Sequence, residues 1–309
     1  MQRFKNILLV LNPEVEETAA IDKAVSLARQ NGARLMLFSV LKEPPGIGYG
    51  ESVVQQQLAA AMTERREWLR GLTIPLRDDN IEFAINVVEG TAFLEIIRQV
   101  LREQHDLVII TAEERKGLKE RLFGATSMHL MRKCPCPVWV IKRMQTRPFS
   151  CVLAAVDPSA RDPKRDSLNP LILQLATSMA RNEAADLHII HVWHLFGESY
   201  VSSRMSEQKL QEAKTHDKEQ SKRRFDTLLG QADFTGLKPY LHLIEGDPEE
   251  RIPELVMEQG IDLLVMGTVC RTGIAGFLIG NTAEEVLNQV DCSVLTLKPE
   301  GFETPVMLE

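Results

Sequence analysis

The sequence predicts an α/β protein built from two tandem, doubly wound domains, each with a parallel sheet. Three observations lead to this fold class. The chain has 309 residues, which fits two ordinary domains at about 100–200 residues each. Its second half repeats its first. Within each half, apolar runs of strand length alternate with segments of helical periodicity, a pattern typical of right-handed βαβ crossovers.

The repeat is clearest toward the end of each half. Val87–Gly90 reads Val-Val-Glu-Gly and matches Leu243–Gly246, Leu-Ile-Glu-Gly, and at the same spacing Cys136 meets Cys292. A register held over such a distance indicates a tandem duplication. We place the domains at 1–145 and 149–299, with Pro148 marking the boundary, and we expect 300–309 to be a surface tail.

The individual elements follow from local pattern. In the first copy, strands are expected at 5–11, 34–41, 81–88, 106–112 and 137–142, because these runs are rich in Val, Ile and Leu and are bounded by turn residues. A helix over 18–30 should end at Asn31-Gly32, a C-terminal cap signal. The second copy repeats the strands at 150–157, 186–193, 238–245, 262–267 and 293–298, with a long, charged, mostly solvated helix near 204–230.

Composition excludes several classes of protein. The chain carries 36 Lys and Arg against 43 Asp and Glu, a net charge of −7, which argues against a role in coating DNA or RNA. No uncharged run approaches the roughly 18 apolar residues of a membrane span, and the first ten residues lead into a strand instead of a signal peptide. Five cysteines without a CxxC pair fit a reducing compartment. We therefore expect a cytoplasmic protein with neither nucleic acid nor membrane as a partner.

The residues that follow the strands are the candidates for binding, because ligands of doubly wound sheets lie beyond the carboxyl ends of the strands. In the second copy, strand four ends at Met266-Gly267-Thr268 and continues through a glycine-rich loop to Gly280 and a helix. Asn281 or Thr282 is expected to cap that helix. Glycines let the backbone approach a ligand, and a helix N-terminus attracts anions. The pattern predicts a phosphate-binding loop, or else a loop that only turns the chain.

This loop resembles that of the universal stress protein family. Nucleotide-binding members carry Gly-x2-Gly-x9-Gly-Ser/Thr after strand four, and here the same frame reads Gly267-x2-Cys270-x9-Gly280-Asn281-Thr282. By the same resemblance, Asp157 corresponds to the aspartate of the family's first strand and Val192 to the residue that borders adenine. The resemblance covers both copies, and the run Gly-Asn-Thr-Ala-Glu is most similar to the tandem E-type members.

Several expectations come from this resemblance alone. Each copy would be a five-stranded sheet with helices on both faces, of the adenine nucleotide alpha hydrolase-like type. The copies would pair through their last strands, Val138–Lys142 and Val294–Lys298, as an internal pseudo-dimer. The ligand would be ATP or another small phosphate-bearing molecule. The protein would be a non-enzymatic regulator in stress survival, including resistance to DNA damage.

The two copies differ in this frame. In the first copy it reads Thr111-x2-Glu114-x9-Gly124-Ala125, and Asn12 replaces the aspartate. A carboxylate at Glu114 would repel a phosphate by about 1 kcal/mol in water. We therefore expect no nucleotide in the first copy and place the site in the second. Its candidate residues are Asp157, Val192, Met266, Gly267, Thr268, Cys270, Gly280, Asn281 and Thr282.

Other chemistry finds little support. No nucleophile, zinc or paired-carboxylate motif occurs, so we name no catalytic residue and no metal site. His188, His191 and His194 are spaced by three, so they cannot converge from one strand, and a structural role is expected.

The cysteines and the remaining functional readings stay as alternatives. Cys134 and Cys136 are interpreted as small buried thiols, whereas Cys270, beside Arg271 and near a helix start, is a hypothetical redox-sensing thiol. A homodimer stays open as an assembly. Three other functions also remain open: a slow nucleotide hydrolase or phosphotransferase, a ligand-free scaffold, and a binder of a phosphorylated lipid or sugar in the same cleft.

Overall fold

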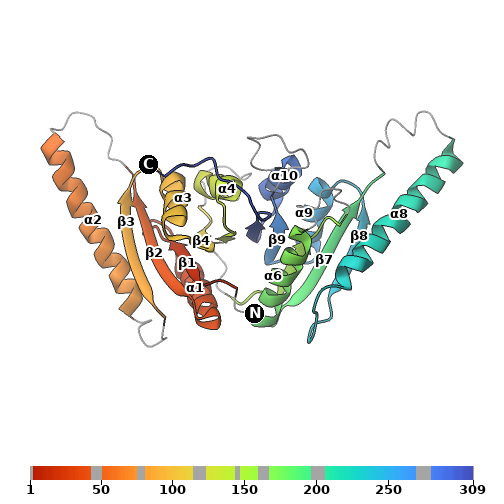
Figure 1. Cartoon of the computed structure of the whole chain (residues 1–309), viewed down its shortest axis with the longest axis horizontal. Coiled ribbons are helices and arrows are strands. Elements are labelled where there is room, and N and C mark those ends of the chain that lie inside the picture. Colours follow the sequence, from red (N-terminus) through yellow and green to blue (C-terminus); the bar gives the residue numbers. More distant parts are fainter. Residues whose placement is uncertain are drawn as a thin grey trace. The chain divides into compact units, whose positions relative to one another are not determined.

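Strands and helices alternate through both halves of the chain in the computed structural model (Figure 1). The structure describes residues 3–42, 51–74, 81–113, 123–142, 147–158, 167–195, 206–268 and 280–308. These residues form two compact units, the second spanning 147–302 and the first comprising the preceding residues together with the tail from 303 onward.

The first unit has a parallel sheet in the order β3-β2-β1-β4-β5. Its strands are β1 (Asn6–Val10), β2 (Arg34–Leu41), β3 (Phe83–Glu89), β4 (Leu107–Thr111) and β5 (Val138–Ile141). Its helices are α1 (Thr18–Asn31), α2 (Glu51–Thr73), α3 (Ala92–Glu103) and α4 (Ala125–Lys133). The α1 helix ends at Gly32, whose φ of 56° is the left-handed cap that the sequence predicts.

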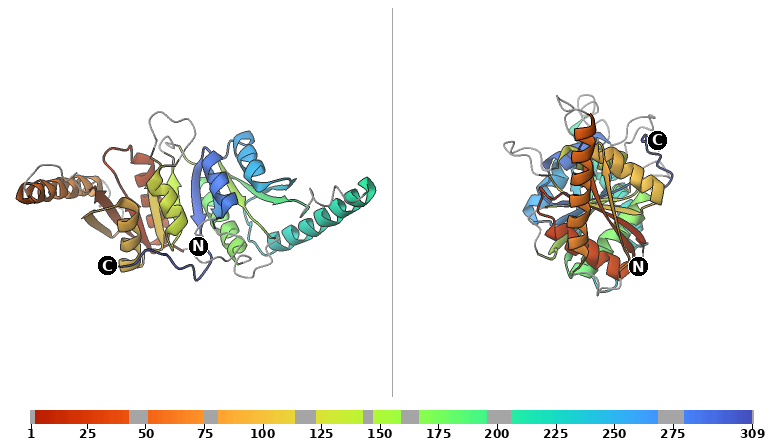
Figure 2. Two further views of the ribbon diagram at one scale, coloured as in Figure 1. Left: turned by 90° about the horizontal axis from the view of Figure 1, so that it is seen from above. Right: turned by 90° about the vertical axis from the view of Figure 1, so that its left-hand side faces the viewer.

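The second unit repeats the arrangement, with parallel strands in the order β8-β7-β6-β9-β10. Its strands are β6 (Cys151–Ala155), β7 (Asp186–Trp193), β8 (Tyr240–Glu245), β9 (Leu263–Gly267) and β10 (Ser293–Leu297). Its helices are α6 (Leu168–Glu183), α8 (Glu207–Leu229), α9 (Pro248–Glu258) and α10 (Asn281–Gln289). As predicted, α8 is long and mostly solvated, with Phe225 and Leu228 buried, and Figure 2 shows it extending past the strands.

Strand order places the helices in two layers within each unit. The crossovers from β1 to β2 and from β2 to β3 run in one direction across the sheet, and those from β3 to β5 run in the other. Right-handed crossovers therefore put α1 and α2 on one face and α3 and α4, which pack together, on the opposite face. The sheet is covered on both faces, which explains the continuous apolar runs of its central strands, and the predicted fold class is confirmed.

The repeated aspartate before strand four has a structural role in both units. Asp106 accepts hydrogen bonds from the backbone N–H groups of Lys5 (2.5 Å) and Asn6 (3.1 Å). Asp262 accepts the equivalent bonds from Ser150 (2.6 Å) and Cys151 (3.1 Å). Each carboxylate thus joins the start of the first strand to the start of the fourth. No helix among the described residues is long and apolar enough to span a membrane.

Candidate functional site

The carboxyl ends of β6, β7 and β9 bring most of the predicted site residues to one edge of the second unit. Met266 and Gly267 end β9, Thr268 follows and is fully buried, and Asp157 follows β6. Val192 lies one residue before the end of β7, beside Ile244 of β8. The N–H of Gly280 donates to the carbonyl of Thr268 (3.0 Å), so α10 begins directly over the end of β9. Cys270 lies outside the described residues.

A neutral amide organises the turn after β6. The backbone N–H of Asp157 donates to Asn169 Oδ1 (2.9 Å), and Asn169 Nδ2 donates to the carbonyl of Asp157 (3.0 Å). Asn169 is buried near the start of α6. The end of the first strand is therefore held in place without adding charge to the cleft.

A buried cation lies at the same edge. Lys298 follows β10 and is 8% exposed, and its ammonium donates to Thr268 Oγ1 and stands 5.0 Å from the ring centre of Phe302. The end of β9 thus carries a positive charge next to the start of α10, where the helix dipole adds to it. We did not predict this residue, although its match with Lys142 in the repeat is a visible signal.

Packing against α6 explains the first glycine of the loop. A Cβ on Gly267 would lie 2.4 Å from Leu168 Cδ2, closer than real carbon atoms approach. Because Gly267 has no Cβ, the side chain of Leu168 can pack directly against the backbone at this position.

The expected side-chain cap of α10 is wrong. The N-cap is Gly280, with no side-chain hydrogen bond, and Asn281 is the first helical residue. The Thr282 hydroxyl instead donates to Glu249 Oε1 of α9 (3.1 Å). Since the N-cap is a glycine, no N-cap side chain takes the first backbone N–H groups of α10.

The same edge of the first unit holds an acid instead. Glu17 is 7% exposed and accepts the backbone N–H of Asn12 through Oε1 (2.8 Å) and the Thr111 hydroxyl through Oε2. The Asn12 N–H is the counterpart of the Asp157 N–H, so Glu17 does in the first unit what the neutral Asn169 does in the second. No fixed spacing relates the two residues to their strands, which is why the sequence did not reveal the pair.

Burial perturbs this carboxyl group strongly. Desolvation raises the pKa of Glu17 from 4.5 to about 7, against the lowering effect of the hydrogen bonds from Thr111 and Asn12. The nearby carboxylates of Glu16 and Glu113 raise it further. An acid that is already costly to ionise would become costlier beside a bound phosphate.

A second carboxylate lies at the start of α4. A Cβ on Gly124 would stand 2.8 Å from Glu113 Oε2, so the Glu113 side chain packs against the N-cap of the helix. In the sequence, Val269 takes the place of Glu113 in the second copy. The predicted repulsion by Glu114 concerns a residue outside the described ranges. The Glu113 carboxylate, joined by Glu17 once that group ionises above its pKa of about 7, gives the first cleft the wrong charge for a phosphate.

The histidines of β7 face opposite sides of the sheet, as the spacing predicts. His188 Nδ1 is 3.1 Å from His242 Nε2, and the His188 ring stacks on Tyr240 with centres 4.8 Å apart. His191 packs on the other face against Phe225 of α8. Burial lowers the pKa of both His188 and His242. Within the described ranges, no group of three or more His, Cys, Asp or Glu is arranged for a metal.

The cysteines are free thiols in the part of the chain that the structure describes. Cys134 is buried as predicted, whereas Cys136 is only partly buried, and its repeat partner Cys292 is buried. The sulfur atoms of Cys134 and Cys136 lie 3.5 Å apart, and this contact, together with desolvation, raises the pKa of Cys136 well above its usual value. Such thiols are poor nucleophiles.

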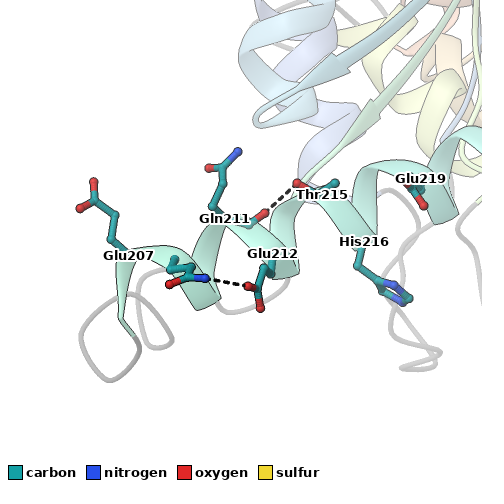
Figure 3. Close-up of a pocket in the computed structure, with 7 residues that line it drawn as sticks. Glu207, Gln211, Glu212, Thr215, His216 and Glu219 are labelled. Carbon is teal, nitrogen blue, oxygen red and sulfur yellow. Dashed lines mark hydrogen bonds between the residues drawn. The ribbon is translucent and has the colours of Figure 1, made fainter.

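A shallow hollow of about 690 Å³ runs along α8 (Figure 3). The described residues that line it all belong to that helix, among them Glu207, Glu212 and Glu219. Glu212 Oε1 accepts a bond from Gln208 (3.4 Å). This acidic surface has the wrong sign for a phosphate, so the strand ends remain the candidate site.

The comparisons with known proteins agree with the fold and the repeat. The model of the universal stress protein family matches the chain twice, at residues 3–142 and 152–298. Universal stress protein E of Salmonella typhi is 26% identical over 319 residues, covering 100% of this chain and 99% of that protein. The universal stress protein E homolog of Haemophilus influenzae is 28% identical, covering 96% of this chain and 98% of its own.

Two solved structures are similar over nearly the full length. A crystal structure from Pseudomonas aeruginosa UCBPP-PA14 that carries the universal stress protein name superposes with a TM-score of 0.72 at 28% identity, covering 97% of this chain and 95% of that one. A universal stress protein from Archaeoglobus fulgidus DSM 4304 gives 0.65 at 17% identity, over 95% and 98% of the two chains, and supports the fold alone.

Proposed function

Since the chain belongs to the universal stress protein family and carries its domain in tandem, we propose that it is a cytoplasmic, non-enzymatic stress-response protein whose second domain binds a small phosphate-bearing ligand such as ATP. The first domain, in this proposal, binds no nucleotide. A role in stress survival, including resistance to DNA damage, rests on the family resemblance.

One contrast carries the proposal. At the carboxyl edge of the first domain, Glu17 and Glu113 place acid beside the end of β4 and the start of α4. At the matching edge of the second domain, the neutral Asn169 holds the end of β6 and the Lys298 ammonium donates to Thr268, while the acid of this edge, Asp157, lies where the flat group of the ligand is proposed. The second edge therefore favours an anion, and the first disfavours one.

The proposed ligand would bind along the predicted residues. Its phosphates would take backbone N–H groups in the first turn of α10, from Asn281 onward, close to Thr268, because the Gly280 N–H already donates to the Thr268 carbonyl. Its base or other flat group would lie between Asp157 and Val192. Thr282 supports this site from α9 through Glu249, instead of donating its hydroxyl to the ligand.

Calorimetric titration of the full chain with ATP tests the proposal, and we expect one site per chain. Asn281→Glu places a carboxylate on the exposed first residue of α10, which should weaken binding roughly fivefold, about 1 kcal/mol. Acid in a first turn favours the helix, so this variant should fold. The matched control is Ala125→Glu, at the exposed first residue of α4, which should leave binding unchanged.

The opposite outcomes are equally clear. No heat at millimolar ATP would exclude the nucleotide, and equal weakening by both variants would remove the site from the second domain. Mass spectrometry of small molecules released from the purified, denatured protein would then identify another phosphate-bearing ligand. Phosphate release above background during incubation with ATP would contradict the non-enzymatic assignment.

The proposed assembly is a separate matter. By family resemblance, the two domains pair through Val138–Lys142 and Val294–Lys298 within one chain. Light scattering coupled to size-exclusion chromatography should then give the mass of a single chain, near 34.8 kDa. A mass twice as large would show that the chain also forms a homodimer.

A further inference from the structure

An arginine of the first domain stands where the fold does not require a cation. Arg65 projects from α2 to the end of β2, where its Nη1 donates to Ser39 Oγ (2.8 Å). Ser39 is fully buried and donates to the carbonyl of Leu11, just after β1. These bonds place the guanidinium near the carboxyl ends of β1 and β2. Figure 1 shows α2, the helix that carries Arg65, alongside β2 and β3.

Arg65 makes no direct ion pair with the described residues. Its interactions there are the bond to Ser39 and a contact with Trp68, whose ring centre lies 5.9 Å from the guanidinium carbon. Glu14 and Glu64 are close enough to raise its pKa, but desolvation outweighs them and the net direction is downward. A guanidinium has five N–H donors, so most of the donors of Arg65 remain available for the acceptor atoms of a bound ligand.

The second domain shows that the same place closes without a cation. The carbonyl of Phe38 accepts the N–H that follows β1, and the carbonyl of Ile190 accepts the N–H that follows β6. The next residues along the chain, Ser39 and His191, therefore occupy equivalent positions. There α8, which corresponds to α2, packs Phe225 on His191 with ring centres 5.9 Å apart. Phe225 matches the buried Leu69, and Ser221 stands at the position of Arg65. Since the second domain folds with a serine at this helix position, the half-buried arginine of the first domain needs another explanation.

We propose that Arg65, Ser39 and Trp68 form a binding site for a small monocarboxylate with a flat apolar body, on the α2 face of the first domain. The carboxylate takes the free edge of the guanidinium in a bidentate pair, and the apolar body lies on the partly exposed indole. The single cation matches a single charge. Because Glu14 and Glu64 lie nearby, a dianionic phosphate monoester is disfavoured.

Benzoate is the probe, titrated into the full chain by calorimetry, with Trp68 fluorescence as a second signal. We expect saturable binding that is about tenfold weaker in Arg65→Gln, since charged hydrogen bonds are lost. Arg65→Lys, which keeps the charge but not the fork, should lie between. Arg66→Gln makes the same charge change at the exposed neighbouring position and should bind like the unaltered protein.

Each outcome decides the proposal. Absence of benzoate binding at millimolar concentration, or equal binding by Arg65→Gln and Arg66→Gln, overturns the site. Tighter binding of phenyl phosphate than of benzoate overturns the ligand class. If Arg65→Gln melts at a lower temperature, Arg65→Lys provides the comparison in a folded protein. ATP binding by the second domain should be unchanged in all these variants, so this test is independent of the proposed function.

Discussion

Protonation of Glu17 should couple the stability of the first domain to pH near neutrality. The carboxyl group is buried, with a pKa of about 7 against an ordinary 4.5. Because the folded state binds this proton more tightly than the unfolded state, stability falls as pH rises from about 4.5 through 7. Above that window the full cost is present, about 3 kcal/mol at 1.36 kcal/mol per pKa unit.

Glu17→Gln removes the titration and keeps an oxygen for the Asn12 N–H. The variant should match the unaltered protein near pH 4.5 and exceed its unfolding free energy by up to about 3 kcal/mol at pH 8. The Thr111 hydroxyl can reverse its role and accept from the new amide. Glu14→Gln is the control, because it removes an exposed acid from the same loop and should show no such pH dependence.

Urea unfolding between pH 4.5 and 8 measures the difference. In a Trp193→Phe background, the remaining tryptophans, Trp68 and Trp139, both belong to the first domain and report its unfolding alone. A difference that is independent of pH would refute the raised pKa. Destabilisation by Glu17→Gln at pH 8 would show that the charged carboxylate is needed for the fold.

Three further predictions concern packing and anchoring. Gly267→Ala should lower the unfolding free energy of the second domain by about 1–2 kcal/mol, measured by urea unfolding, because the new Cβ meets Leu168. In a Leu168→Ala background the same substitution should cost less unfolding free energy. Asp106→Asn should cost the first domain about 1–3 kcal/mol in the same assay, since its carboxylate holds two backbone N–H groups of β1. Deletion of 303–309 should lower the melting temperature of the first domain and leave that of the second domain unchanged. The reason is that the tail belongs to the first unit, where Arg98 Nε donates to the carbonyl of Met307 (3.4 Å). A shift in the melting transition reported by Trp193 of the second domain would contradict this.

The sequence was sufficient for the fold because its signals are local and repeated. Strand runs, the Asn31-Gly32 cap and the matching Asp106 and Asp262 each follow from short-range physics, and duplication shows most of them twice. The repeat also located the strand ends, and with them Gly267 and Thr268. A loop motif, however, reports the backbone path and leaves the side chains that line it unspecified.

The charges that decide binding escaped the sequence for a physical reason. Glu17 and Asn169 reach the strand ends from loops of different length, five and twelve positions after the residues they hold, so no alignment pairs them. Lys298 reads as a surface lysine until its burial beside Thr268 is known. The capping of α10 was mispredicted because the helix begins at Asn281 with Gly280 as its N-cap, and the Thr282 hydroxyl bonds instead to Glu249 of α9.

Duplication of one ancestral domain explains why the first cleft holds Glu17 where the second holds the neutral Asn169. A single ancestral cleft needs an anion to compensate the N–H groups and helix dipole at its strand ends. In the first domain the side chain of Glu17 takes the place of that anion, and its burial raises its pKa toward neutral pH. In the second domain the neutral Asn169 holds the end of β6 in place of a carboxylate, and Lys298 adds positive charge beside Thr268. If this reasoning holds, Glu17→Gln combined with Glu113→Val should raise the affinity of the first domain for inorganic phosphate, measured by calorimetry at pH 8. An unchanged affinity would show that other features of the first cleft exclude the anion.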